Sequence, residues 1–330
     1  MGSVPHIVED CMGVLQVFSD GSVNRCSLTD INFNIPVIDD GSVGFKDITF
    51  DQKNKLSLRL YKPISTNQDS KLPVVFYFHG GGFCLGSHKW PNYHNCCIRL
   101  LSVLRALVVS PDYRLAPEHK LPAAIDDATS AVEWLLREAL GESTNNRDAW
   151  IGRTADFDRV FVLGDSSGGN MAHHLAVRLA TGSVQLAPIR VRGFVLLAPF
   201  FGGVERTKSE EGPCKATLSL EILDRYSFKT FRASIPVTQS RNHPMVNPFG
   251  PNSPNLEKVA LDSILVIVGG NELLKDRVES YWRKLKDLGK KIECVEFEGE
   301  QRGFLMNDSY SEVSDEALQV IKRFMTENSN

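Results

Sequence analysis

The sequence has little that would suit it to a membrane or to nucleic acid. No apolar run approaches the length of a membrane span, and Lys and Arg number 37 against 40 Asp and Glu, for a net charge of -3. We therefore expect no membrane and no nucleic-acid partner. The first ten residues, MGSVPHIVED, contain neither the basic nor the apolar region of a secretory signal, so the expected location is the cytoplasm.

Motifs for metals and nucleotides are missing as well. There is no H-E-x-x-H, no paired C-x-x-C and no phosphate-binding glycine loop, so we expect no metal and no cofactor. The seven cysteines have no regular spacing, which is typical of free thiols in a reducing compartment. The composition leaves a monomer and a homodimer equally open.

A strand, a tight turn and a helix are predicted around residues 161–170, FVLGDSSGGN. The apolar run ends in G-x-S-x-G, and the helix-compatible segment NMAHHLAVRLA follows at once. This is the pattern of a nucleophile elbow, a strained turn that raises a serine hydroxyl above the edge of a sheet. Ser166 is therefore the candidate nucleophile.

Apolar runs alternate with helix-like segments along the rest of the chain. Such alternation predicts an α/β fold, with a mostly parallel central sheet covered by helices on both faces. We expect a single domain over 1–330, with an N-terminal arm at 1–40 and a charged insertion at 201–255. The expected strands lie at 43–50, 56–63, 72–79, 191–200, 261–270 and 290–299 and within 106–119, and the expected helices at about 122–140, 277–289 and 311–325.

Three successive glycines follow the buried strand at 72–79, in the segment HGGGF. Glycines leave backbone N–H groups open to a cavity, because no side chain stands in the way. Together with the N–H of Ser167, the residue after the nucleophile, such a loop can hold a developing oxyanion.

Four segments, HGGGF (79–83), YRLAPEH (113–119), GDSSGGN (164–170) and NPFGPNSPNL (247–256), together resemble the hormone-sensitive-lipase class of α/β hydrolases. The resemblance spans nearly the whole chain and is strongest to plant carboxylesterases, whose relatives include gibberellin receptors and enzymes of monoterpene indole alkaloid pathways. It implies an α/β-hydrolase fold with Ser166 as nucleophile. It also implies an oxyanion hole from Gly81, Gly82 and Ser167, and a cap formed by the arm and the insertion over a pocket for a small ester or alkaloid.

The acid of a catalytic triad should follow the strand LVIVGG, where the family has Asp-x-Leu-x-Asp. This chain reads Glu272-Leu273-Leu274-Lys275-Asp276. Glu272 takes the first acid position, and a glutamate can serve there. Asp276 is the secondary candidate.

The histidine of the triad is missing. The family has Gly-x-x-His-Gly-Phe after the last strand, whereas Arg302 stands at the histidine position here, and no histidine follows His243. His79 belongs to the glycine loop. His94, His173, His174 and His243 are the remaining candidates for a substitute base, and we expect none of them to serve.

An arginine cannot do the work of the histidine, because a guanidinium has a pKa above 12 and does not give up its proton in proteins. It would instead pair with Glu272, in a one-point or a bidentate contact. We expect ester hydrolysis to be reduced or lost and a reaction without an acyl-enzyme to be favoured: deformylation, elimination or cyclisation. Two alternatives stay open, an ester hydrolase with an unusual base and a gibberellin-receptor-like binding protein that uses the N-terminal arm as a lid.

Overall fold

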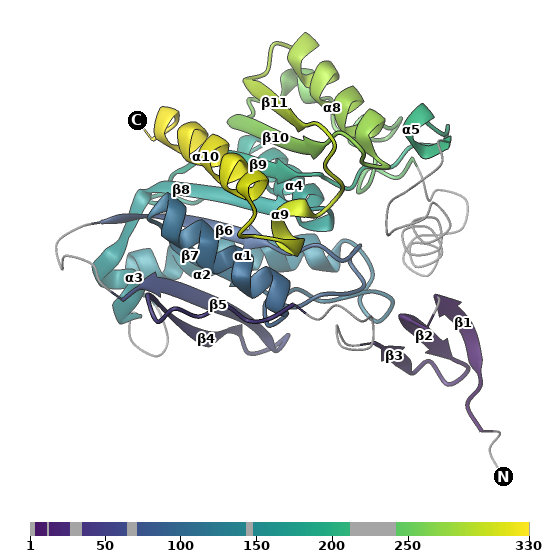
Figure 1. Cartoon of the computed structure of the whole chain (residues 1–330), viewed down its shortest axis with the longest axis horizontal. Helices are drawn as coiled ribbons and strands as arrows, with labels where there is room; N and C mark the ends of the chain where they lie inside the picture. Colours follow the sequence, from purple (N-terminus) through teal and green to yellow (C-terminus); the bar gives the residue numbers. More distant parts are fainter. Residues whose placement is uncertain are drawn as a thin grey trace.

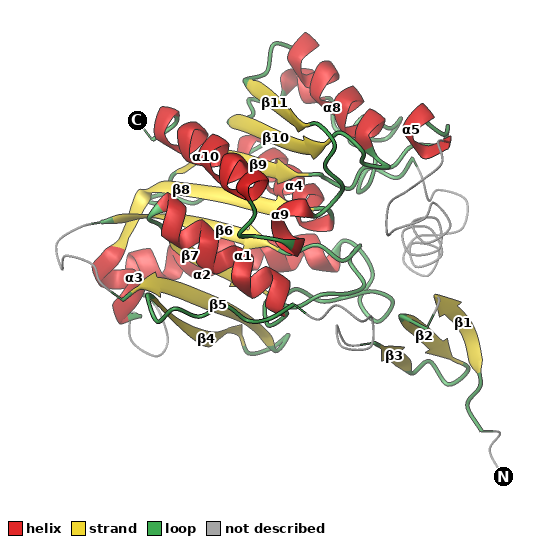
Figure 2. Ribbon diagram, in the orientation of Figure 1, coloured by secondary structure: helices red, strands yellow, loops and turns green. Residues whose placement is uncertain are grey.

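Eight strands form one twisted sheet at the centre of the computed structural model, which describes residues 4–11, 13–26, 35–64, 71–142, 148–211 and 242–329 (Figures 1 and 2). The strand order is β11-β10-β9-β8-β6-β7-β5-β4. The pairings from β11 across to β7 are parallel, and β5 and β4 are antiparallel additions at one edge. The predicted mostly parallel sheet is confirmed.

The strands of this sheet lie where the apolar runs predicted them. They are β4 (Val43–Asp51), β5 (Leu56–Pro63), β6 (Leu72–Phe78), β7 (Leu107–Pro111), β8 (Ala155–Asp165), β9 (Val191–Leu197), β10 (Ser263–Gly269) and β11 (Ile292–Phe297). The described helices are α1 (Pro91–Leu104), α2 (Ala123–Leu140), α3 (Ala149–Thr154), α4 (Ser167–Ala180), α5 (Lys208–Glu211), α8 (Lys275–Asp287), α9 (Phe304–Asn307) and α10 (Glu312–Glu327).

The sequence patterns predicted α2, α4, α8 and α10 but did not predict α1. That helix carries two asparagines, a histidine and two cysteines, and ten of its fourteen residues are buried. A helix buried on most sides has no polar stripe, so its 3.6-residue periodicity is hard to see in the sequence. The helix-like stretch that we expected at about 216–232 lies outside the described residues.

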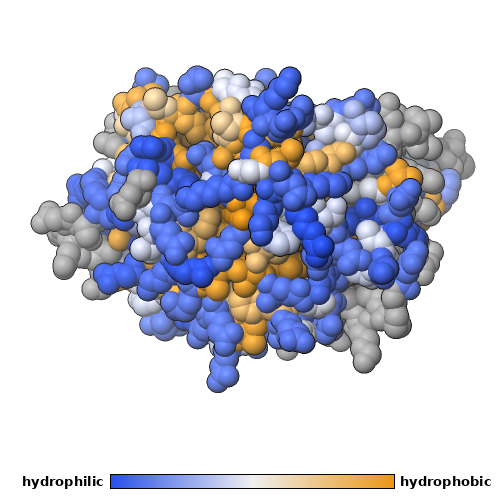
Figure 3. Space-filling model, turned by 90° about the horizontal axis from the view of Figure 1, so that it is seen from above, coloured by the Kyte–Doolittle hydropathy of each residue, from blue (hydrophilic) through white to orange (hydrophobic). Residues whose placement is uncertain are grey.

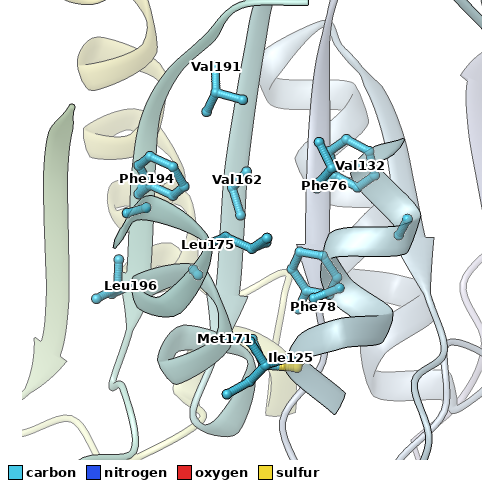
Figure 4. Packing of buried hydrophobic residues seen from close by; sticks show 14 of the residues in the cluster. Phe76, Phe78, Ile125, Val132, Val162, Met171, Leu175, Val191, Phe194 and Leu196 are labelled. Carbon is cyan, nitrogen blue, oxygen red and sulfur yellow. The ribbon is translucent and has the colours of Figure 1, made fainter. Parts of the chain in front are cut away.

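Helices cover both faces of the sheet, as predicted. On one face α2, α4 and α8 pack over the inward side chains of the parallel strands, and Figure 4 shows Phe76 and Phe78 of β6 beside Met171 and Leu175 of α4. On the other face α1, α9 and α10 cover the alternate side chains, among them Tyr77. Because both faces are buried, the central strands can be apolar at every position.

The N-terminal arm forms a second, three-stranded antiparallel sheet of β1 (Ile7–Cys11), β2 (Leu15–Phe18) and β3 (Val23–Arg25). It lies at one side of the main body, beyond the loops at one end of the central sheet (Figure 1). A turn at Ser19–Ser22 connects β2 to β3. Asp20 caps it by accepting from the N–H of Ser22 at 2.9 Å.

The surface shown in Figure 3 is mostly hydrophilic, with apolar patches interrupted by charged side chains. Among the described helices, none is both long and apolar enough to cross a bilayer.

Candidate active site

Ser166 occupies the sharp turn between β8 and α4. Its backbone adopts a left-handed conformation (φ 55°), its N–H donates to the Leu197 carbonyl at 2.9 Å, and its own carbonyl accepts from Phe200 N at 2.8 Å. A Cβ at Gly168 would lie 2.0 Å from the Phe78 carbonyl oxygen, so only glycine fits there. The strand, turn and helix of the predicted elbow are confirmed.

The guanidinium of Arg302 lies between Ser166 and Glu272. Its Nη2 donates to Ser166 Oγ at 3.2 Å and to the Ala198 carbonyl at 2.5 Å. Its Nη1 forms an ion pair with Glu272 Oε1, and the side chains of the two residues are 10% and 0% exposed. The structure thus brings together the three residues that the sequence singled out, with Arg302 30 positions from Glu272 and 136 positions from Ser166.

The ion pair has only one point of contact on the carboxylate. Glu272 Oε2 has no hydrogen-bond partner among the described residues, so the pair is not bidentate. Burial raises the pKa of Glu272, and the charge and hydrogen bond of Arg302 lower it without cancelling the effect of burial. Glu272 fixes the guanidinium from the side opposite Ser166.

Asp276, the secondary acid candidate, faces the insertion instead of Ser166. Its Oδ2 accepts from the N–H of Ser209 in α5 at 2.8 Å, and Ser209 Oγ donates to the Leu273 carbonyl at 2.8 Å. These bonds join the first helix of the insertion to the start of α8. Asp276 is therefore placed where it can hold the insertion against the body.

Gly81 and Gly82 form a turn next to the elbow, with φ angles of 118° and 61°. A Cβ at Gly81 would lie 2.1 Å from the Leu85 carbonyl oxygen. Within the described segments no acceptor is bonded to the N–H groups of Gly81, Gly82 or Ser167. Those three N–H groups, which the sequence predicted as the oxyanion hole, thus have no backbone acceptor in the part of the chain that the structure describes.

His79 packs against the glycine turn and hydrogen bonds to it. Its Nδ1 donates to the Gly80 carbonyl at 2.7 Å, and the Tyr113 hydroxyl donates to the His79 carbonyl at 2.9 Å, with the two rings stacked at 4.3 Å. Asp112 lies 3.6 Å from His79 Nε2 and 3.2 Å from His88 Nδ1. Burial raises the pKa of Asp112, but the two neighbouring histidines outweigh burial and hold that pKa far below its usual range.

The eight histidines all fall within the described residues, and in that part of the chain none hydrogen bonds to Ser166. The four candidates for a substitute base have other partners. These are Tyr61 Oη for His94 (2.9 Å), Tyr281 Oη for His173 (2.9 Å), the Met245 carbonyl for His174 (3.0 Å) and Met245 N for His243 (3.2 Å).

Asp165, which the sequence analysis did not single out, is a buried acid directly beside the nucleophile. It is 6% exposed, and its Oδ1 has no partner within the described segments. Burial raises its pKa to about 7, with Arg302 lowering and Glu272 raising it. An acid directly after the apolar run VFVLG of β8 was the available signal. Asp165 is the residue directly before the serine in G-x-S-x-G, and an aspartate at that place is also typical of a turn.

Replacing Asp165 by Asn is expected to change how stability depends on pH. The unfolded chain releases this proton near pH 3.8, whereas the folded protein keeps it up to about pH 7. Between these values the folded state binds more protons, so the carboxyl makes the protein less stable as pH rises. Urea unfolding at pH 5 and pH 8 should show Asp165→Asn gaining stability relative to the parent by a few kcal/mol across this interval.

A substitution of Asp287, an exposed carboxyl on α8, is the matched control and should leave the pH dependence as it is in the parent. Equal pH dependence for Asp165→Asn and the parent would show that Asp165 is already ionised in the folded protein.

Comparison with known proteins places the fold and the elbow in one class. A family model described as alpha/beta hydrolase fold matches residues 75–306, and a carboxylesterase family model matches residues 28–117. The hyperthermophilic esterase from the archaeon Pyrobaculum calidifontis superposes with a TM-score of 0.70 at 29% identity, over 89% of this chain and 87% of that one. The chain belongs to the α/β-hydrolase-fold family.

Two plant proteins narrow the class. The 3-O-acetylpapaveroxine carboxylesterase CXE2 of Papaver somniferum is 36% identical over 81% of this chain and 86% of its own length. The 2-hydroxyisoflavanone dehydratase of Glycyrrhiza echinata is 31% identical over 94% of both chains. Within its family, the protein is a member of the plant carboxylesterases.

Proposed function

We propose that this carboxylesterase-family enzyme acts in plant specialised metabolism and that Arg302 stands in place of the histidine base of a triad. Its substrate is then a small ester, in our view a monoterpene indole alkaloid, and hydrolysis of that ester is reduced or lost. A non-hydrolytic reaction replaces hydrolysis: a deformylation of the akuammicine-synthase type, an elimination or a cyclisation. The observation that carries the proposal is the hydrogen bond from Arg302 Nη2 to Ser166 Oγ at 3.2 Å.

The direction of that hydrogen bond decides the chemistry. A serine attacks an ester only when a neighbouring base accepts its proton, and a guanidinium has five donors and no acceptor. Arg302 therefore occupies a lone pair of Ser166 Oγ and leaves the hydroxyl proton in place. Ser166 keeps its O–H and can donate it to an oxygen of the substrate, so the residue acts as a hydrogen-bond donor rather than as a nucleophile.

The hydrogen-bond donors of the site, which are backbone N–H groups and the Ser166 hydroxyl, suit a reaction in which negative charge develops on a carbonyl oxygen. In a retro-aldol deformylation, an ester with a neighbouring hydroxymethyl group gives its hydroxyl proton to a water molecule, and the C–C bond to the hydroxymethyl carbon breaks. The electron pair of that bond moves into the ester carbonyl as an enolate, formaldehyde leaves, and the protonated water returns its proton to the carbon. The N–H groups of Gly81, Gly82 and Ser167 and the Ser166 hydroxyl would stabilise the enolate oxygen. No water is consumed and the ester survives.

The two plant relatives support both parts of the proposal. The Papaver protein is named for the hydrolysis of an acetylated papaveroxine. The Glycyrrhiza protein is named for a dehydration, which is an elimination that consumes no water. At least one relative of this family is therefore named for a reaction that is not a hydrolysis.

The test is product analysis by mass spectrometry with alkaloid methyl esters that carry a hydroxymethyl group beside the ester. We expect a product that has lost the mass of formaldehyde and retains the methyl ester. Ser166→Ala should slow this reaction by about 10²- to 10³-fold and leave substrate binding nearly unchanged, because a single donor to the enolate is removed while the backbone donors remain. Release of methanol with gain of a free acid would instead identify an ester hydrolase, of the norfluorocurarine-synthase type or a general carboxylesterase. Tight gibberellin binding with no turnover would identify a receptor.

A further inference from the structure

One arginine connects the N-terminal sheet to the glycine turn. Arg25 of β3 donates from Nε to the Cys84 carbonyl and from Nη2 to the Ala116 carbonyl, each at 2.7 Å. The same guanidinium forms an ion pair with Glu118, with Nη1 to Oε1 at 2.6 Å. The side chain of Arg25 is 23% exposed and that of Glu118 is 40% exposed. The planar guanidinium of Arg25 thus donates to three residues that belong to two segments of the chain.

The two carbonyls belong to segments that are already bonded to each other and to the glycines. The N–H groups of Cys84 and Leu85 both donate to the Gly81 carbonyl at 3.0 Å, and the Ala116 N–H donates to the Phe83 carbonyl at 2.8 Å. The turn at 81–85 and the segment around 116 therefore move together. A contact at the Cys84 carbonyl reaches Gly81 through one intervening hydrogen bond.

Apolar side chains surround this contact. Leu15 of β2, only 3% exposed, clusters with Cys84, Leu85 and Ala116, and Val14, Val23 and Trp90 pack against the cluster. The hydrogen bonds of Arg25 to the two carbonyls are thus made at the edge of a small apolar core. In such a setting the loss of the donor leaves carbonyls poorly satisfied.

We propose that Arg25 is a positioning residue for the glycine turn, so that the N-terminal sheet and the oxyanion donors of Gly81 and Gly82 order together. The inference rests on the oxyanion role given to those glycines under the proposed function. An oxyanion donor must be placed to within a fraction of an ångström, so a side chain that fixes a neighbouring segment also fixes the position of that donor.

The first experiment measures order in the turn itself, independently of any reaction. Hydrogen–deuterium exchange by mass spectrometry is compared for the full-length parent, Arg25→Ala and Arg25→Lys. We expect exchange of the peptide covering 81–86 to be at least about tenfold faster in Arg25→Ala and intermediate in Arg25→Lys, with β6 and β8 unchanged. The control is Arg192→Ala, since Arg192 makes the same kind of contact at the far end of the sheet, to the carbonyl and carboxylate of Asp158.

The second experiment measures the consequence for catalysis. Each substitution is placed in the Arg302→His protein, and hydrolysis of p-nitrophenyl acetate is followed, because this substrate is too small to contact the N-terminal sheet. We expect Arg25→Ala to lower kcat by about 10- to 100-fold with KM nearly constant, and Arg192→Ala to lower neither. A merely structural role for Arg25 would lower the active fraction and leave kcat per active site, titrated with a serine-directed phosphonate, unchanged.

The two experiments separate this proposal from the proposed function. Unchanged exchange at 81–86 in Arg25→Ala overturns the positioning role, whatever the chemistry of the site. Faster exchange with an unchanged kcat per active site shows that the turn is not the oxyanion hole and overturns it also. If Arg25→Ala does not fold, Glu118→Gln and Arg25→Lys are measured in its place, and both should show faster exchange at 81–86 and a lower kcat than the parent and the control.

Discussion

Arg302→His is expected to raise hydrolysis of a small activated ester by about 10³-fold or more. A neutral imidazole at this position has an acceptor nitrogen for the Ser166 proton and an N–H for Glu272, which already lies on the opposite side of Arg302. The elbow and the glycine turn need no rearrangement. The measurement is the initial rate on p-nitrophenyl acetate for the parent and for Arg302→His.

The double variant Ser166→Ala/Arg302→His is the control, and it should return to the rate of the parent because the nucleophile is gone. The gain in Arg302→His should also increase with pH through the range in which an imidazole loses its proton, near 6.5. A fast parent that Arg302→His barely changes would mean that another residue is the base, and the protein would then be an ordinary carboxylesterase.

Arg302→Met is expected to destabilise the protein by about 3 to 5 kcal/mol. Methionine fills much of the volume of the arginine but leaves the buried carboxylate of Glu272 without its cation and the Ala198 carbonyl without its donor. Urea unfolding with tryptophan fluorescence is the measurement. The double variant Arg302→Met/Glu272→Leu should recover much of the loss, since it removes the unpaired charge.

The loss in Arg302→Met should be larger at pH 8 than at pH 5. Burial already raises the pKa of Glu272 above its ordinary 4.5, and removal of Arg302 takes away the influence that lowers it. The folded state then binds a proton that the unfolded chain has released, so stability falls as pH rises above 4.5. Arg283→Met is the matched control. Its side chain is 66% exposed and paired with Glu279, and its loss should cost under about 1 kcal/mol at either pH. A similar loss in both variants would show that the Arg302 ion pair contributes little.

The sequence predicted the fold and the centre of the site because both depend on short-range patterns. Apolar runs between turn signals define β6, β8, β9 and β10, and the glycines at 164 and 168 are required by backbone contacts near 2 Å. The resemblance of residues 299–304 to the family's Gly-x-x-His-Gly-Phe was enough to predict Arg302 at the position of the histidine. Each of these inferences needs only neighbouring residues or the order of motifs along the chain.

The remaining features depend on contacts that leave no local pattern. Arg25 meets backbone carbonyls 59 and 91 positions away, and a carbonyl acceptor has no sequence signature. The hydrogen bond from Arg302 to the Ala198 carbonyl could not be predicted from the sequence for the same reason. Asp276 and Glu272 are four positions apart, and only the packing of α5 on α8 separates their roles.

The Ala198 carbonyl also bears on how such a site could evolve. Ala198 directly follows β9 in a left-handed conformation (φ 41°), and Arg302 donates to its carbonyl, to the Glu272 carboxylate and to the Ser166 hydroxyl at once. A histidine that serves both the serine and the carboxylate has no donor left for that carbonyl. Restoring hydrolysis therefore costs a hydrogen bond, and selection for stability alone would keep the arginine. Replacement of the histidine by arginine is therefore easier than the reverse. A lineage that acquires arginine at position 302 gains a hydrogen bond to the Ala198 carbonyl, and a return to histidine loses it.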